Sequence, residues 1–155
     1  MIMGKFGKFD VKGLQDFQDK LKQLDDPNKL MEACAKELAA RLLAKVIKRT
    51  PVGQYPSGSG KKGGTLRRGW TGQRQGTASS YADSLTVQHT GNMYQIDIIN
   101  PVEYASYVEY GHRTPSHTGW VKGRFMMTIS ENELQSIAPK VLEKKILNYM
   151  QGLVN

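Results

Sequence analysis

The chain has 155 residues and a net charge of +8, with 22 lysines and arginines against 14 aspartates and glutamates. This length suits one domain, because domains mostly contain about 100–150 residues. A single cysteine, Cys34, cannot form an internal disulfide, which excludes a disulfide-stabilised secreted scaffold. The sequence contains no signal-peptide pattern and no apolar run near the ~20 residues that a membrane-spanning helix needs. We therefore expect one soluble domain over residues 1–155 that has no membrane partner.

The positive charge is concentrated in one segment. Residues 38–82 contain no acidic residue and nine basic ones, which are Arg41, Lys45, Lys48, Arg49, Lys61, Lys62, Arg67, Arg68 and Arg74. A segment of this kind attracts DNA or an acidic protein surface, or it forms a solvated basic surface without a special partner. The last five of these residues are the candidate contacts to DNA or to an acidic partner.

Two helices are predicted before residue 50. Apolar residues at steps of three and four indicate a first helix over residues 13–24. Asp26 and Pro27 are typical of an N-cap and a first helical position, and a broad apolar stripe follows to residue 49. Thr50 and Pro51 should end this second helix, because a residue that precedes proline disfavours the helical backbone. Cys34 falls within the apolar stripe, where a thiol usually acts as a small buried hydrophobe.

A flexible loop and three strands are predicted next. Residues 51–64 contain five glycines and two prolines, so they should form a loop inserted within the domain, Gly/Lys-rich over residues 53–64. Strand patterns cover residues 65–71, 84–89 and 94–99. Residues 90–93 provide a tight turn between the last two strands, which favours an antiparallel hairpin.

The C-terminal part of the chain should be mainly helical. Residues 103–110 indicate a short helix, and Gly111 is placed to end it in a left-handed conformation. Residues 112–123 are expected to form a loop, and a long helix should begin at Arg124, with a kink or restart at Pro139. These elements predict an α+β fold in which a small antiparallel β-sheet packs against a long N-terminal helix and a long C-terminal helix.

The usual motifs of catalysis and metal binding are missing from the sequence. The three histidines and the one cysteine do not have zinc-ligand spacing, and there is no CxxC or HExxH motif. There is no nucleophile motif of the GxSxG type, and Gly58 to Lys62 do not match a phosphate-binding loop. The sequence therefore predicts no catalytic residue, no metal site and no cofactor.

One segment is dense in aromatic and basic residues. It contains Tyr104, Tyr107, Tyr110, His112, Arg113, Trp120 and Arg124. Tyrosine, tryptophan and arginine are the residues enriched at the energetic centres of protein interfaces. The cluster is interpreted as a subunit interface, as a phosphate-handling cleft of an RNase, or as aromatic filling between the sheet and the C-terminal helix. The absence of a matched acid–base pair favours an interface over a cleft.

The motifs in this part of the chain resemble a known family. They are Asn100-Pro101-Val102-Glu103-Tyr104-Ala105, Val108-Glu109-Tyr110-Gly111-His112-Arg113, Gly119-Trp120-Val121 and Gly123-Arg124-Phe125-Met126, preceded by Thr50-Pro51-Val52, Gly64, Leu66-Arg67-Arg68 and Trp70. This order is similar to that of the small tail-completion or tail-terminator proteins of siphophages, prophages and tail-like particles. The sequence departs from the family pattern Thr-Pro-Val-Asp-Thr-Gly, because Gly53 stands in place of the acidic residue and residues 54–63 are inserted.

The resemblance implies a structural subunit without enzymatic activity that is assembled in the host cytoplasm into a virion or tail-like particle. It would form a ring, often hexameric, that ends the tail tube and contacts the tube protein and the head–tail connector or collar protein, with non-specific DNA contact in the lumen. The expected interface residues are Tyr104, Tyr107, Glu109, Tyr110, His112, Arg113, Trp120, Arg124 and Phe125. The alternative is a small basic nucleic-acid-binding protein or RNase, which the basic segment and the His/Arg/Tyr cluster would serve.

Overall fold

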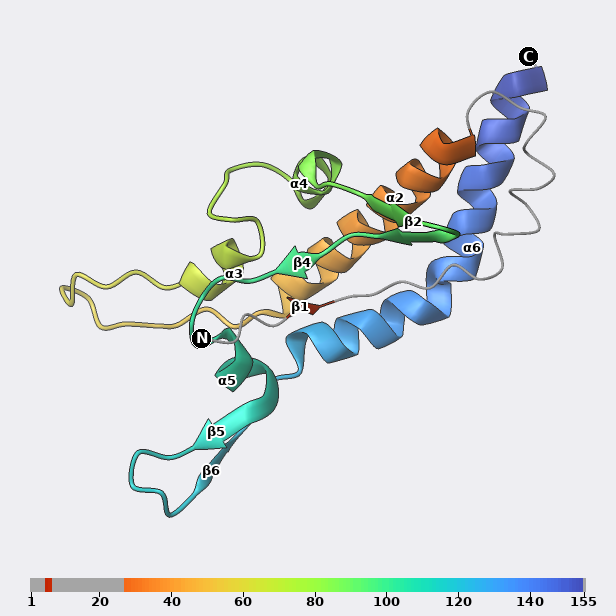
Figure 1. Cartoon of the computed structure of the whole chain (residues 1–155). Helices are drawn as coiled ribbons and strands as arrows, with labels where there is room; N and C mark the ends of the chain where they lie inside the picture. The colour runs from red at the N-terminus through yellow and green to blue at the C-terminus, as the bar shows by residue number, and fades with distance from the viewer. Residues whose placement is uncertain (1–4, 7–26, 155) are drawn as a thin grey trace.

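A computed structural model describes residues 5–6 and 27–154 of the chain (Figure 1). Two long helices, α2 (Pro27–Arg49) and α6 (Met126–Val154), pack against each other, and several of the shorter elements contact α2. This arrangement confirms the predicted α+β class. The helix predicted over residues 13–24 lies outside the described residues.

Helix α2 provides the largest share of the core among the described elements. It spans the predicted residues, and its buried face consists of Leu30, Met31, Cys34, Leu38, Ala39, Leu42, Leu43 and Val46. These positions recur at steps of three and four, so they lie on one broad side of the helix. The amide of Thr50 donates to the carbonyl of Val46 at 2.9 Å, and the helix ends there, as predicted.

Helix α6 packs its apolar side against α2. Met126, Met127, Leu134, Leu142 and Ile146 are buried. Pro139 lies inside the helix, and the ribbon changes direction about halfway along (Figure 1). Proline removes a backbone hydrogen bond and crowds the preceding turn, which accounts for a bend in a helix that nevertheless continues.

The described strands form three separate antiparallel pairs. Strands β2 (Gln88–Thr90) and β3 (Met93–Gln95) form the predicted hairpin, in which Thr90 pairs with Met93. Strand β4 (Ile98–Ile99) pairs with β1 (Lys5–Phe6), so the single strand predicted over residues 94–99 is divided in two. The buried side chains of Tyr94, Ile96 and Ile98 nevertheless alternate as predicted.

Two predictions upstream of this hairpin were wrong. Residues 65–71 are not a strand, because Thr65–Gly69 forms helix α3, which places Leu66 and Trp70 on the same buried side. The strand predicted over residues 84–89 begins only at Gln88, because helix α4 (Ala78–Ser84) includes Ser84 and residues 85–87 form no regular element. Thr77 and Ser80 form a reciprocal capping box at the start of α4, a local signal that outweighs the alternating pattern.

The loop predicted over residues 112–123 was also wrong in part. Helix α5 (Ala105–Tyr110) is followed by a hairpin of β5 (Gly111–Arg113) and β6 (Trp120–Lys122), which projects from the helical body (Figure 1). Gly111 has the expected positive φ of 89°, but its ψ of 174° lies outside the left-handed helical region, in a conformation essentially restricted to glycine, and the residue begins β5. A side chain at Gly123 would collide with the backbone of Glu109 and Tyr110, which explains why the chain can return so closely along α5.

Candidate functional site

Thr50 joins the end of α2 to helix α3. Its hydroxyl is buried, donates to the carbonyl of Val46 at 2.6 Å and accepts the indole N–H of Trp70 at 2.8 Å. The guanidinium of Arg67 donates two hydrogen bonds to the Thr50 carbonyl, at 2.7 and 3.2 Å. The last carbonyls of a helix lack hydrogen-bond partners within the helix, and a buried carbonyl without a partner destabilises the fold. The Arg67 guanidinium provides that partner for the Thr50 carbonyl.

Asn100 joins α3 to the segment before α5. Its side-chain amide donates to the carbonyl of Leu66 at 2.8 Å, and its side-chain oxygen accepts from the amide of Val102 at 3.1 Å. The residue is 2% exposed, and Gly69 packs so closely on it that a side chain at Gly69 would collide with the Asn100 amide. The motifs around residues 50, 66–70 and 100 therefore form one hydrogen-bonded joint.

Glu109 holds the start of α6. The carboxylate is 1% exposed and accepts hydrogen bonds from the amides of Met127 and Thr128, both at 2.9 Å, and from the Thr128 hydroxyl at 2.7 Å. A helix N-terminus has unsatisfied N–H groups and a partial positive charge, so a carboxylate from another element is a strong cap. Glu109, which was predicted as an interface residue, is therefore buried within the chain and caps helix α6.

Backbone contacts hold the same junction. The amide of Arg124 donates to the Val108 carbonyl at 2.7 Å, and the amide of Phe125 donates to the Glu109 carbonyl at 3.0 Å. Phe125 has a φ of 49°, an uncommon conformation for a bulky residue, which the surrounding contacts maintain. Helix α5, the β5–β6 hairpin and the start of α6 are thus fixed relative to one another.

Large aromatic side chains surround this junction and face solvent. We use the name aromatic face for the exposed apolar residues of this segment, which are Tyr104, Tyr107, Tyr110, Trp120, Val121 and Phe125. Trp120 and Val121 are consecutive in β6, so they point to opposite sides of the hairpin. Tyr107 is 59% exposed and Trp120 is 63% exposed, so neither side chain fills the space between the sheet and α6. The ring of His112 lies 5.7 Å from that of Tyr107, and Arg113 and Arg124 are exposed beside them. The face is apolar and aromatic, with a basic edge.

Two groups near the aromatic face have raised pKa values. Burial raises the pKa of the Tyr110 hydroxyl, and the nearby carboxylates of Glu109 and Glu131 raise it further. Burial also raises the pKa of Glu131, with a contribution from Glu109. Burial is the larger cause of both pKa shifts, and the neighbouring acidic groups add to it.

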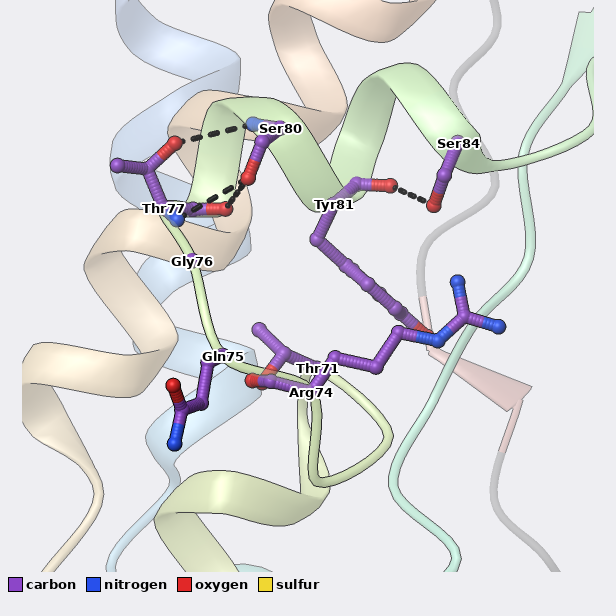
Figure 2. A pocket seen from close by; sticks show the side chains of 8 residues that line it. All are labelled: Thr71, Arg74, Gln75, Gly76, Thr77, Ser80, Tyr81 and Ser84. Atoms are coloured by element: carbon purple, nitrogen blue, oxygen red, sulfur yellow. Dashed lines mark hydrogen bonds between the residues drawn. The ribbon is translucent and has the colours of Figure 1, made fainter.

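The basic residues predicted to contact DNA or an acidic partner lie at separate places in the fold. Lys61 and Lys62 are exposed on the loop, whereas Arg67 is half-buried and occupied by Thr50. Arg68 is exposed and donates to the carbonyl of Gly63 at 3.2 Å. Arg74 extends beside the ring of Tyr81, 6.0 Å from its centroid, in a small pocket that includes the Thr77–Ser80 cap (Figure 2). These residues do not form one compact anion site.

Further basic residues of the same segment pair with acids elsewhere in the chain. Lys45 and Arg49 bind the carboxylate of Glu133 on α6 at 3.0 and 2.6 Å. These hydrogen bonds hold the pKa of Glu133 below its usual range. Arg41 binds Glu37 at 2.9 Å. Part of the basic segment therefore connects the two long helices.

The described residues offer little for catalysis or metal binding. Across residues 5–6 and 27–154, no group of three or more His, Cys, Asp or Glu side chains could hold a metal ion. None of the helices in that part of the chain is long and apolar enough to cross a membrane. Cys34 is 1% exposed, and burial raises the pKa of its thiol to about 11, which disfavours the reactive thiolate.

The Cys34 shift predicts a specific pH dependence. The thiol ionises near 9.0 in the unfolded chain and near 11 in the folded one, so the folded state favours the protonated form. This stabilisation is complete below pH 9 and is lost as the pH rises towards 11. We expect the free energy of unfolding, measured by urea denaturation, to fall more steeply over this range in the wild type than in Cys34→Ala. Parallel curves would contradict the buried thiol.

Residues 14–111 match the family model described as "Bacteriophage HK97-gp10, putative tail-component". This match covers well over half of the chain, so the chain belongs to that family and is a component of a phage tail. No curated protein and no solved structure matches the chain. The match ends at Gly111, so the β5–β6 hairpin and α6 lie beyond it.

Proposed function

We propose that this tail component is a subunit of a closed hexameric ring at the head-proximal end of the tail. The ring ends growth of the tail tube and contacts the tube protein on one side and the connector or collar protein on the other. Its role is structural and requires no reaction. The aromatic face is the observation that carries this proposal.

The composition of the aromatic face supports a protein contact. Tyrosine and tryptophan contribute large contact areas, and their exposure beside arginine is typical of interface centres. The supporting joint reduces the entropic cost of binding, because Glu109 and the backbone contacts already order the segment. A rigid aromatic surface of this kind is better suited to assembly than the same side chains on a mobile loop would be.

A second exposed apolar patch supports the ring in particular. Leu147 and Met150 are exposed on the C-terminal half of α6, at the opposite end of the molecule from α5 and the β5–β6 hairpin (Figure 1). A closed ring requires two different patches that meet around a rotation axis. The positions of these patches at opposite ends support a head-to-tail contact between neighbouring subunits.

Substitutions on the aromatic face test the proposal. Tyr107→Ala combined with Arg113→Ala removes two exposed side chains, so the melting temperature should change little. Each interface loses about 2 kcal/mol or more per residue, or roughly 30-fold in affinity per residue, and the ring should dissociate. Size-exclusion light scattering at micromolar concentration should then show single chains of 17.3 kDa.

Tyr55→Ala is the matched control, because Tyr55 is an exposed tyrosine outside the aromatic face. This variant should remain a ring. A double variant that is folded and still hexameric would contradict the role of the aromatic face. An unfolded double variant would show that these side chains belong to the core.

Contact with DNA in the ring lumen is proposed for Lys61, an exposed basic residue of the loop. Binding through phosphates weakens steeply with salt, by roughly one power of the salt concentration for each phosphate contacted. Ring formation through aromatic contacts should persist in salt and in nuclease-treated protein. The alternative function, a nucleic-acid-binding protein or RNase, instead requires a monomer whose activity depends on His112 or Arg113.

A further inference from the structure

Residues at the two ends of the inserted loop form one wall of a pocket beside α5. The pocket has a volume of about 370 Å³ and lies between the loop, the start of α3, helix α5 and Arg124. Ring closure through the aromatic face does not by itself explain this feature, because most of the pocket consists of residues outside that face. The insertion therefore needs a separate role.

The lining of the pocket combines apolar and basic groups. Leu66 is buried and Val108 is half-buried, so they form an apolar base together with Val52. Tyr55 and Tyr104 contribute partly exposed aromatic side chains. Lys62 and Arg124 are both exposed, and none of the described residues that line the pocket is acidic. An apolar base beside two cations favours an apolar group that lies next to an anion.

Close contacts hold the loop in place. A side chain at Gly63 would collide with the carbonyl of Gly53, so the two ends of the insertion touch. The ring of Tyr55 lies over Gly53, 3.3 Å from the position a side chain would take there. The guanidinium of Arg68 donates to the carbonyl of Gly63 at 3.2 Å. The pocket is therefore formed before any ligand binds, which lowers the cost of binding.

We propose that this pocket binds an extended acidic segment of a neighbouring tail protein. An aliphatic or aromatic side chain of that segment occupies the space above Leu66, and adjacent carboxylates pair with Lys62 and Arg124. The aliphatic base favours a protein segment over a nucleic acid strand, which carries no aliphatic side chain to cover it. The identification of the partner as a tail protein rests on the proposed function.

A displayed library of random heptapeptides tests this pocket. The library is selected in parallel on the wild-type protein and on Lys62→Glu. Peptides with Asp or Glu next to Leu, Ile, Val or Phe should be enriched on the wild type and lost on the variant. A resynthesised peptide from the selection should bind Lys62→Glu at least about tenfold more weakly. Lys144→Glu has the same charge change at an exposed position on α6, outside the pocket, and should bind within about twofold of the wild type.

Three outcomes would overturn the proposal. They are selected peptides without an acidic bias, equal binding to Lys62→Glu, and displacement of the peptide by a twelve-residue oligothymidylate, which would assign the pocket to nucleic acid. Val52→Asp checks the apolar base and should abolish binding without unfolding, because Val52 is exposed. Light scattering of the same samples separates this proposal from the ring. A monomeric protein that still binds the peptide through Lys62 would contradict the proposed ring and support the proposed peptide-binding pocket.

Discussion

Replacing Glu109 with alanine is expected to lower the free energy of unfolding by about 3–5 kcal/mol, the range for a buried charged group whose partners lose their contacts. The carboxylate is the cap of α6, and its loss leaves the Met127 and Thr128 amides without their acceptor. It also removes the negative charge that complements the helix N-terminus. Urea or guanidinium denaturation followed by circular dichroism measures the change.

Glu109→Gln keeps the shape of the side chain but removes its charge, so it measures how much the charge contributes to stability. The amide keeps one oxygen acceptor but turns an N–H group towards N–H donors, so an intermediate loss of about 2 kcal/mol is expected. Glu103→Ala, at an exposed position on the approach to α5, is the control and should change stability by less than about 0.5 kcal/mol. A Glu109→Ala protein as stable as the wild type would show that the cap is not needed.

Asn100→Asp should be the second strongly destabilising substitution, by about 2–4 kcal/mol at neutral pH. The new side chain has the same shape but places a buried negative charge against the Leu66 carbonyl, which now receives a hydrogen bond at 2.8 Å. The joint between α3 and the segment before α5 should therefore weaken. Denaturation at pH 7 measures the effect.

The pH dependence of that variant provides a check on the mechanism. The introduced carboxyl prefers its neutral form in the folded protein, so its folded pKa lies above the unfolded value of about 3.9. The defect should be small below that pH, where a protonated carboxyl can donate to Leu66, and should grow as the pH rises. Asn100→Ala lacks the titrating group and serves as the control. A defect of the same size at pH 4 and pH 7 would contradict this mechanism.

The elements that could be predicted were those with strong local signals. Helix α2 has an apolar stripe and a proline at its first position, and the β2–β3 hairpin has a turn around Gly91 with a φ of 59°. Helix α5 was predicted within two residues, and the bend in α6 follows from Pro139. In each case neighbouring residues alone determine the geometry.

The elements that were missed depend on contacts between distant parts of the chain. Helix α3 exists where Trp70 reaches Thr50 and Asn100 reaches Leu66, contacts between motifs 20 and 34 residues apart. The β5–β6 hairpin requires the glycine contacts between Gly111 and Gly123. The division of the basic segment likewise depends on Glu133, which lies far along the chain on α6.

The subunit contact predicted for the residues around α5 and the β5–β6 hairpin stays a prediction. Tyr107 and Trp120 are exposed, as an interface requires, whereas Glu109 turned out to be buried as a helix cap. No local signal reveals a cap supplied by another element. The pocket beside the inserted loop could not be predicted either, because its lining comes from residues 51–66, α5 and Arg124.

Native mass spectrometry of nuclease-treated wild-type protein tests whether the chain forms a closed ring. A closed ring predicts a single species with about six times the 17.3 kDa mass of the chain, and the same species in low and high salt. A purely monomeric protein at tens of micromolar, or one that assembles only when nucleic acid is present, would contradict the proposed ring.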